Sequence, residues 1–397
     1  MMEERRKKEA AWELLTSGLF APPFGASVPG GGIVYLLDDE FTTDAAASFA
    51  SPALSEPGPG KLVRAADSAS RVSKDAGDLL WSGAAASANV DPAYYFTDSA
   101  DASFTRAAGL TAIFKLISTG VMNFGFTTNT TIANATMFGF LSNSGTSLSY
   151  TRAGNTVVIG SFSAATTYLL AATLRTNGIE FRIKGGAYSE WSTIFVETNW
   201  STTPVWPAIT QSGSVTSRFP FVRIPLLADV GKLATGSHIL SQDAPDTTIL
   251  TASNSALFLL TATSVAGAGG NLIEVRTQQA DANNYMLARI QWNGSNYELV
   301  TGHVIAGVET LQGAPIATVF GTSGVNRLWI RDVGTAHDFF STGGTTISKR
   351  YATITDASGG ANVGTSVRIV GGFTSVNLTA WDYNDAAIAA ILDRLSA

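Results

Sequence analysis

The sequence contains no cysteine and only three histidines, His238, His303 and His337, which excludes several kinds of site at the outset. Without cysteine there is no disulfide, no thiolate ligand for zinc and no thiol nucleophile. None of the histidines shows the His-x-x-x-His or Glu-x-x-His spacing of a helix-borne zinc site. The chain therefore lacks the residues for thiol chemistry and the spacing for zinc chemistry.

Charge is also scarce, because only 14% of the 397 residues are Asp, Glu, Lys or Arg, well below the usual quarter. The net charge of −6 and the pI near 5.2 argue against a nucleic-acid binder. No apolar run approaches the roughly 18 residues of a membrane span, and the charged N-terminus has no hydrophobic signal region. Few charges and 39 glycines suit a protein that buries much of its surface in an assembly, or an apolar, turn-rich monomer.

The signatures of hydrolytic sites are missing as well. No Gly-x-Ser-x-Gly nucleophile elbow occurs. Asp38, Asp39 and Glu40 are adjacent, so on a strand they alternate between faces and cannot form one carboxylate pair. We therefore predict that the protein is not an enzyme.

What the chain has is the pattern of antiparallel sheet, most clearly in Leu272–Thr301. Alternate residues from Met286 to Trp292 are apolar, which places them on one face of a strand. Asn293-Gly294 then gives a strong hairpin signal. A two-residue turn there would place Arg289 opposite Glu298, and we prefer it for that charge pair. A four-residue loop, Asn293–Asn296, keeps the same faces but loses the pair.

A second Asn-Gly hairpin is predicted within Thr173–Ile183. A two-residue turn at Asn177-Gly178 would pair Arg175 with Glu180 across the strands. The two hairpins lie about 115 residues apart, each among short predicted strands. They suggest two related domains, although Asn-Gly hairpins are common and the likeness could arise by chance.

Many short strands without intervening helices predict an all-β fold of two antiparallel jelly-roll β-sandwiches with short terminal helices. We expect an N-terminal helix and a Pro/Gly-rich linker in residues 1–32, a first sandwich in 33–226, and a second sandwich with a C-terminal helix in 227–397. The apolar spacing of Asp385–Leu395 predicts that C-terminal helix. We expect it to pack on its own sandwich, with a subunit contact as the alternative.

Several residue patterns resemble concanavalin A-like lectin and laminin-G-like sandwich modules of phage tail and other virion structural proteins. In the first half they are the run Ile179–Trp191 with its Lys-Gly-Gly turn, the Trp/Pro-containing run from Trp200 to Pro207, and the closing Phe221–Pro225. In the second half they are Val325–Asp332 and Asn362–Gly372. The resemblance implies a concanavalin A-like fold. Such folds also host glucanases, but their Glu-x-Asp-x-x-Glu-like run is absent here.

The resemblance also implies candidate ligand sites. A carbohydrate would need an exposed aromatic platform, for which the candidates are Tyr188, Trp191, Trp200 and Trp206; core packing is the alternative role. No cofactor is required, but many laminin-G-like modules hold calcium at the sandwich rim. The oxygen-rich candidates for such a site are Asp281 and Asn283, with Asn284, and Asp382 and Asp385, with Asn384. Turn and helix-cap chemistry is the alternative for both groups.

The function that these observations favour is a non-enzymatic phage virion protein, a tail, fibre or capsid-surface component, assembled in the host cytoplasm. The alternative is a carbohydrate-binding adhesin or accessory module. We expect the partners to be other virion proteins or further copies of the chain, with a cell-surface glycan for host attachment, and neither nucleic acid nor membrane. Contact with the assembly is expected through the N-terminal helix, at Arg5, Arg6, Trp12, Leu15 and Leu19.

Overall fold

The protein is described by a computed structural model. The described residues are 35–41, 47–48, 53–54, 61–88, 90–98, 103–104, 109–133, 136–143, 146–152, 155–175, 178–197, 205–225, 236–240, 247–250, 254–264, 269–343, 346–359 and 362–397. The predicted N-terminal helix and its linker lie outside these residues, and so do residues 226–235 of the connection expected at 226–237, whose last two residues begin a strand.

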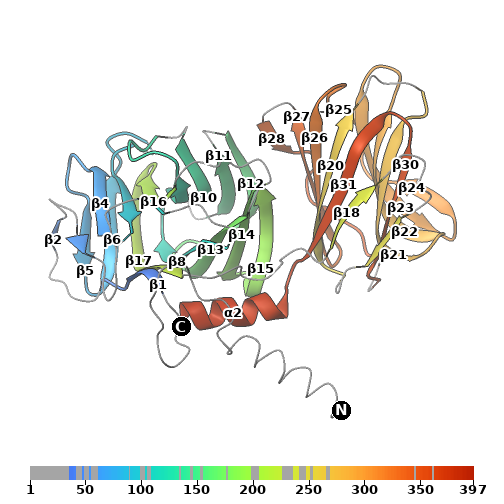
Figure 1. Cartoon of the computed structure of the whole chain (residues 1–397). Coiled ribbons are helices and arrows are strands. Elements are labelled where there is room, and N and C mark those ends of the chain that lie inside the picture. The colour runs from blue at the N-terminus through green and yellow to red at the C-terminus, as the bar shows by residue number, and fades with distance from the viewer. Residues whose placement is uncertain are drawn as a thin grey trace, which may run out of the picture.

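Four antiparallel sheets form two β-sandwiches, which confirms the predicted fold class (Figure 1). In the first sandwich, sheet A has the strand order β15-β14-β13-β8-β17-β6-β5-β2, with β1 also on β17, and sheet B has the order β12-β11-β10-β9-β16-β7-β4-β3. In the second, sheet C is β18-β31-β20-β26-β27-β28, with β29 on β27. Sheet D is β19-β30-β21-β22-β23-β24, with β25 on β23.

The strands are mostly short and follow one another closely along the chain. Those of the first sandwich are β1 Tyr35–Asp39, β2 Ala47–Ser48, β3 Ala53–Leu54, β4 Lys61–Ala66, β5 Val72–Asp75, β6 Asp78–Ala84, β7 Ala93–Thr97, β8 Thr111–Ser118, β9 Met122–Thr127, β10 Met137–Asn143, β11 Ser147–Arg152, β12 Asn155–Ser161, β13 Thr167–Arg175, β14 Gly178–Gly185, β15 Tyr188–Glu197, β16 Trp206–Gln211 and β17 Ser214–Pro225. Those of the second are β18 Gly236–Leu240, β19 Thr247–Leu250, β20 Ala256–Ser264, β21 Leu272–Asp281, β22 Asn284–Trp292, β23 Tyr297–Ile305, β24 Val308–Leu311, β25 Ile316–Phe320, β26 Val325–Val333, β27 Ala336–Gly343, β28 Thr346–Lys349, β29 Ile354–Thr355, β30 Gly364–Val370 and β31 Phe373–Asp382. The helix α2 spans Ala386–Ser396.

The two sandwiches repeat one strand order. Sheet A from β15 to β6 corresponds strand for strand to sheet C from β28 to β18, and sheet B from β12 to β7 corresponds to sheet D from β24 to β19. The correspondence also follows the order along the chain, with β25 and β29 as the additional strands of the second sandwich. The repeated strand order supports two related domains without reference to the Asn-Gly hairpins. The two Asn-Gly hairpins are not equivalent in it, because β13–β14 corresponds to β26–β27 rather than to β22–β23.

The second hairpin has the four-residue loop, so the preferred two-residue turn was wrong. Trp292 pairs with Tyr297, and Gln291 rather than Arg289 lies opposite Glu298. The carboxamide oxygen of Asn293 accepts hydrogen bonds from the backbone N–H groups of the two residues at the end of the loop, at 3.0 and 2.9 Å. This capping stabilises the longer loop, and the strand faces are unchanged because the register differs by two residues.

The first hairpin also forms, between β13 and β14, but its register differs from the predicted one. Arg175 pairs with Gly178, and Glu180 pairs with Thr173 instead of Arg175. Residues 176–177, which connect the two strands, lie outside the described residues. As in the second hairpin, the shift is by two residues, so the inward and outward faces stay as predicted.

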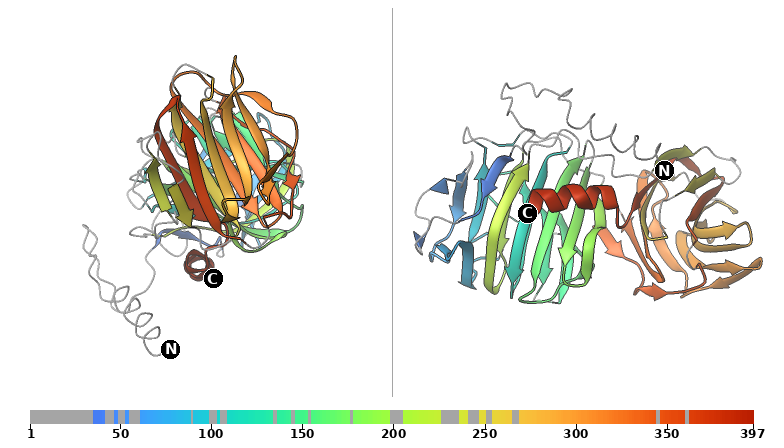
Figure 2. Two further views of the ribbon diagram at one scale, coloured as in Figure 1. Left: turned by 90° about the vertical axis from the view of Figure 1, so that its right-hand side faces the viewer. Right: turned by 90° about the horizontal axis from the view of Figure 1, so that it is seen from below.

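The helix α2 is where predicted, but it does not pack on its own sandwich. Asp385 caps it by accepting from two backbone N–H groups of the first turn. It crosses the outer face of sheet A in the first sandwich (Figure 2) and buries Ile388, Leu392 and Leu395 there. Asp393 accepts from Lys184 Nζ at 2.7 Å and from the indole of a β15 tryptophan at 2.9 Å. The apolar stripe in the sequence predicted burial, but not against which sheet.

The sandwiches meet through a buried interface in which sheet C covers the edge strands β15 and β12. The Trp329 ring stacks on Phe195, with centroids 5.5 Å apart, and its Nε1 donates to the β15 backbone at 2.6 Å. Arg331 Nη1 donates to carbonyl oxygens of both edge strands, and Asp338 accepts from its Nη2 at 2.6 Å. Trp381 Nε1 donates to Glu180 at 3.1 Å. This interface leaves both edge strands covered, which removes their pairing capacity.

Candidate functional site on the outer face of sheet D

The outer face of sheet D is the sheet surface at the end of the molecule remote from the first sandwich (Figure 2). The outer face of sheet C packs on the first sandwich, and that of sheet A carries α2. The alternation seen in Leu272–Thr301 explains which residues sheet D presents, because strand residues alternate between core and surface. Inward residues join the second core, while the outward ones include Glu274, Arg276, Tyr285, Leu287, Arg289, Val300 and Val304.

An ion-pair network runs across this face from β21 to β24. Glu274 accepts from Arg276 Nε at 2.8 Å and from Arg289 Nε at 2.6 Å. Arg289 also makes a two-point contact with Glu309, at 3.1 and 2.5 Å. The Arg276 guanidinium lies over the Tyr285 ring, 4.7 Å from its centroid. Glu274, Arg276 and Arg289 are each held by two neighbours, and Glu309 by Arg289, which gives the face a defined hydrogen-bonding pattern.

The charges of the network reinforce one another. Glu274 is only 1% exposed. Burial alone would raise the pKa of its carboxyl, but the guanidinium groups of Arg276 and Arg289 lower it below its usual value. The pKa of Arg289 is raised, because its two carboxylate partners outweigh the effect of burial. Both shifts favour the charged forms of Glu274 and Arg289. The exposed Arg368 on β30 pairs across the strands with Glu274.

Sequence reasoning identified the outward face of β22 but missed this network, since it paired Arg289 with Glu298. The available signal was the alternation in Ile273–Arg276, which places Glu274 and Arg276 on the same face as Arg289 once β21 and β22 pair. Glu309 reaches the network because the short edge strand β24 pairs with β23. No alternation or turn signal in the sequence predicts that pairing.

A second polar cluster contains serine, histidine and aspartate but lacks the geometry of a catalytic triad. The Asp356 carboxylate accepts from Ser358 Oγ at 2.5 Å and contacts His303 Nδ1 at 2.5 Å. Ser358 Oγ lies 3.4 Å from that same ring nitrogen. A triad requires the hydroxyl and the carboxylate on opposite ring nitrogens. This cluster therefore ties the loop after β29 to β23 and does not activate the serine.

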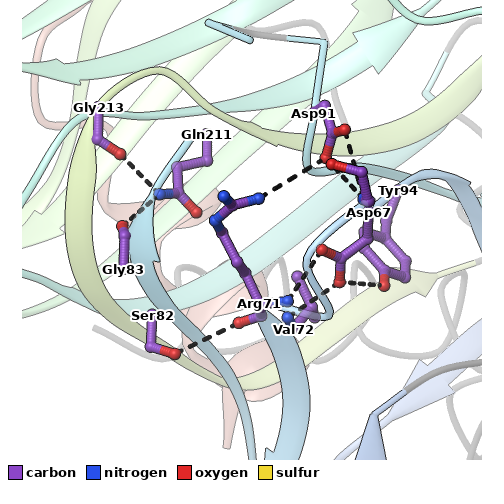
Figure 3. A network of polar contacts seen from close by, with 10 residues as sticks. Asp67, Arg71, Val72, Ser82, Gly83, Asp91, Tyr94, Gln211 and Gly213 are labelled. Carbon is purple, nitrogen blue, oxygen red and sulfur yellow. Dashed lines mark hydrogen bonds and ion pairs between the residues drawn. The ribbon is translucent and has the colours of Figure 1, made fainter. Parts of the chain in front are cut away.

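In the first sandwich, a polar network holds the turn between β4 and β5 (Figure 3). One oxygen of the buried Asp67 carboxylate accepts from the Arg71 backbone N–H at 2.8 Å. The other accepts from the Val72 N–H at 3.1 Å and from the Tyr94 hydroxyl at 2.9 Å. Nearby, Gln211 Nε2 donates to two backbone carbonyls at 2.6 Å each. These contacts satisfy backbone groups of turns, so the network is structural.

The described candidates for carbohydrate binding lie on two different sheets, and one of them is buried. Trp191 is buried, and its Nε1 donates to Asp393 of α2. Tyr188 is half-buried on the same strand, and its hydroxyl accepts from the Ser161 N–H at 3.1 Å. Trp206 begins β16 in the other sheet and packs edge-on against a tyrosine of β7. Trp200 lies outside the described residues. Among those that are described, no platform of these rings is assembled.

The predicted calcium residues make local hydrogen bonds. The exposed Asp281 carboxylate accepts from the Asn283 N–H at 2.7 Å and from the Asn284 side chain, which lowers its pKa. Asp385 caps α2, and Asp382 is buried within β31. In the described part of the chain, no three histidine, aspartate or glutamate side chains gather as metal ligands. The assembly residues Arg5, Arg6, Trp12, Leu15 and Leu19 precede the described residues.

No helix in the described part of the chain has the length and apolarity that a membrane span requires.

Comparisons with known proteins give matches at the level of fold. No protein-family model matches the chain, and no curated protein matches it in sequence. Among solved structures, galectin LEC-6 of Caenorhabditis elegans is 13% identical with a TM-score of 0.28, covering 36% of this chain and 94% of its own. The carbohydrate-binding module CBM66 of Bacillus subtilis is 11% identical with a TM-score of 0.26, covering 38% of this chain and 91% of its own. A GH43 protein of Bacillus licheniformis is 11% identical with a TM-score of 0.27, covering 62% of this chain and 73% of its own. At these identities the likeness concerns the β-sandwich fold alone.

Proposed function

We propose that this is a non-enzymatic structural protein of a phage virion, a tail, fibre or capsid-surface component that displays two lectin-like sandwiches. The observation that carries the proposal is the buried connection between the sandwiches. Independent binding modules in one chain usually meet through small, polar contacts that permit relative motion. Here Trp329, Arg331 and Trp381 are buried between the sandwiches. The helix α2, which follows the second sandwich in sequence, forms a further contact by packing on the first.

Such a unit suits display, because a fixed body sets the distance between an attachment point and a presented surface. The strand β1 lies in the first sandwich, where the Tyr35 hydroxyl donates to the Leu395 carbonyl of α2 at 3.3 Å. The first described strand therefore lies beside α2, whereas sheet D forms the far end of the molecule (Figure 1). We propose that residues 1–24 attach the protein to the particle, with Trp12 and Leu15 in the buried part of the contact.

Deletion of residues 1–24 tests this proposal. The truncated chain should keep its thermal unfolding but fail to enter the particle, and electron microscopy of intact particles should locate the full-length protein only. A matched control replaces Arg5 and Arg6 by lysine, which keeps the charge and should permit incorporation. Normal assembly of the truncated chain would show that attachment occurs elsewhere.

A carbohydrate-binding role is the second candidate, and the outer face of sheet D favours it. Its fixed carboxylate and guanidinium groups could each bridge two neighbouring hydroxyls of a sugar, and Tyr285 lies beside them. The test is a glycan array with the full chain, followed by Glu309→Gln and Arg368→Ala, two exposed changes that leave Glu274 paired. A similarly exposed control is Arg394→Ala on α2. If no glycan binds, or if binding is unchanged in both face variants, this role is excluded for sheet D.

A further inference from the structure

Two of the three histidines of the chain meet at one aspartate in the second sandwich. His303 lies on β23 of sheet D, and His337 lies on β27 of sheet C. His303 Nδ1 is 2.5 Å from the Asp356 carboxylate, and His337 Nε2 is 3.3 Å from the Asp356 backbone oxygen. Residues 354–359, which we call the strap, begin with β29 on β27 and thus contact a histidine of each sheet.

Asp356 is the residue through which the strap is held. Its N–H donates to the Thr335 carbonyl at 2.8 Å. One oxygen of its carboxylate accepts from the Ser358 N–H at 2.8 Å and from the hydroxyl of the same residue at 2.5 Å. The other oxygen, which contacts His303, also accepts from Gln312 Nε2. The strap therefore joins sheet C to sheet D through a side chain that is 7% exposed.

Both ring nitrogens of His337 face oxygen atoms. Nδ1 lies 2.8 Å from Asp332 Oδ1 on β26, while Nε2 faces the Asp356 carbonyl. A neutral imidazole has one N–H, so it would set a nitrogen lone pair against one of these oxygens, whereas the imidazolium donates to both. His337 and Asp332 are each 1% exposed, and Asp332 Oδ2 has no hydrogen-bond partner among the described residues. A carboxylate so deeply buried requires a cation beside it, so the geometry fits the charged form of His337.

Among the described residues, Asp332 and Asp356 are the charged groups that face His337. Arg331 and Asp338 are each one residue removed from this ion pair along β26 and β27, so they lie on the opposite faces and pair with each other. On the sheet D side, a small cavity adjoins His337. The side chains of sheet D that line it are uncharged, and the polar ones are Thr277, Thr301 and Gln312.

The surroundings of His337 favour its protonated form. Burial alone would lower its pKa, but the hydrogen bonds and charges of Asp332 and Asp356 raise the pKa above its usual value. This raised pKa belongs to the closed strap. The stabilisation is therefore complete below about pH 6.5, the ordinary pKa of histidine, and is lost as pH rises through the raised value.

We propose that the strap is a pH-sensitive latch between sheets C and D, closed while His337 donates to Asp332 and Asp356 and open once that ring is neutral. The neutral ring keeps its bond to the Asp332 carboxylate, which is a stronger acceptor than a carbonyl. Nε2 then presents a lone pair to the Asp356 carbonyl oxygen, and the strap separates from it. Release moves the Asp356 carboxylate away from His303 and Gln312, so the contact with sheet D is lost as well.

An imidazole NMR titration of the full chain tests the latch, because the chain has only three histidines and single variants assign their signals. The His337 ring should titrate above about pH 6.5. Hydrogen exchange, corrected for the intrinsic effect of pH, should follow the strap amides of Asp356 and Ser358. Their protection should fall as His337 titrates, by about tenfold for each unit by which its pKa exceeds the ordinary value.

Three variants separate the latch from a general effect of pH. His337→Gln is neutral at every pH and should make the protection of the strap independent of pH in this range. Asp332→Asn removes the buried counter-charge and should move both the titration and the loss of protection to lower pH. The control His238→Gln changes the third histidine, on β18 of the same sandwich, and should leave both curves unchanged.

A His337 ring that titrates at or below the ordinary pKa of histidine would overturn the proposal. So would strap protection that stays constant while His337 titrates. Both results come from the wild-type chain and do not depend on how the variants fold. A loss of protection that persists unchanged in His337→Gln would assign the effect to another group and would equally refute a latch at His337.

Discussion

Replacement of Leu392 by alanine should destabilise the first sandwich, although Leu392 follows the second sandwich in sequence. The side chain is 1% exposed and lies in the middle of the apolar side of α2, against sheet A. Removing it leaves a cavity that the neighbouring strands can close only in part. Buried leucine-to-alanine changes cost about 2–5 kcal/mol, and because Leu392 is fully covered we expect a value within that range.

Differential scanning calorimetry, with urea unfolding followed by tryptophan fluorescence, measures the effect. The wild-type chain should unfold in one transition, because the interface and α2 couple the sandwiches. In Leu392→Ala the transition should move to lower temperature and broaden or split. The control Ala390→Gln changes an exposed residue of the same helix and should stay within about 0.5 kcal/mol of the wild type. Equal stability of the two variants would show that α2 does not hold the sandwiches together.

Three further predictions concern the interface and the core. Burial alone would raise the pKa of Asp338, but Arg331 and Lys349 lower it below its usual range, to about 2. The lowered pKa contributes about 2 kcal/mol above pH 4 that is lost as pH falls towards 2; urea unfolding at pH 5 and pH 2.5 should show this loss, and Asp338→Asn should remove it. Trp329→Phe removes a hydrogen bond to a buried carbonyl and should cost about 1–3 kcal/mol in thermal unfolding; unchanged stability would mean that water replaces the bond. A Cβ added at Gly139 would lie 2.2 Å from a backbone oxygen of β9, so Gly139→Ala should destabilise by about 1–3 kcal/mol, whereas Gly269→Ala, with open space around it, should not.

The sequence was sufficient to predict the sandwich fold, because alternation and turn residues are local properties. In β22 the inward position of Ala288 and Ile290 followed directly from their spacing. Hairpin registers were less predictable. The four-residue loop at Asn293 is stabilised by the Asn293 side chain, which accepts hydrogen bonds from two backbone N–H groups. These bonds outweigh the ion pair between Arg289 and Glu298 for which the two-residue turn was predicted.

The contacts between distant segments could not be predicted from such patterns. The spacing of Ile388 and Leu392 indicates a buried face, but nothing local specifies that sheet A is its partner. The role of Trp191 was equally hard to predict, since an aromatic residue beside a turn can form either a sugar-binding platform or a packing contact. Here its indole Nε1 donates to Asp393, about 200 positions later in the chain. The ion pairs of sheet D likewise join residues of three strands, β21, β22 and β24, and only the fold determines which strands are neighbours.

The return of α2 to the first sandwich has a consequence for synthesis on the ribosome. Strands β1–β17 emerge first, but the outer face of sheet A stays uncovered until Ile388, Leu392 and Leu395 have been made. During that interval the nascent chain exposes the apolar surface that α2 later covers, a kind of surface that chaperones recognise. A product that terminates before α2 would keep this apolar surface exposed and would be prone to aggregation or degradation. The helix thereby makes completion of the first sandwich depend on translation of the second.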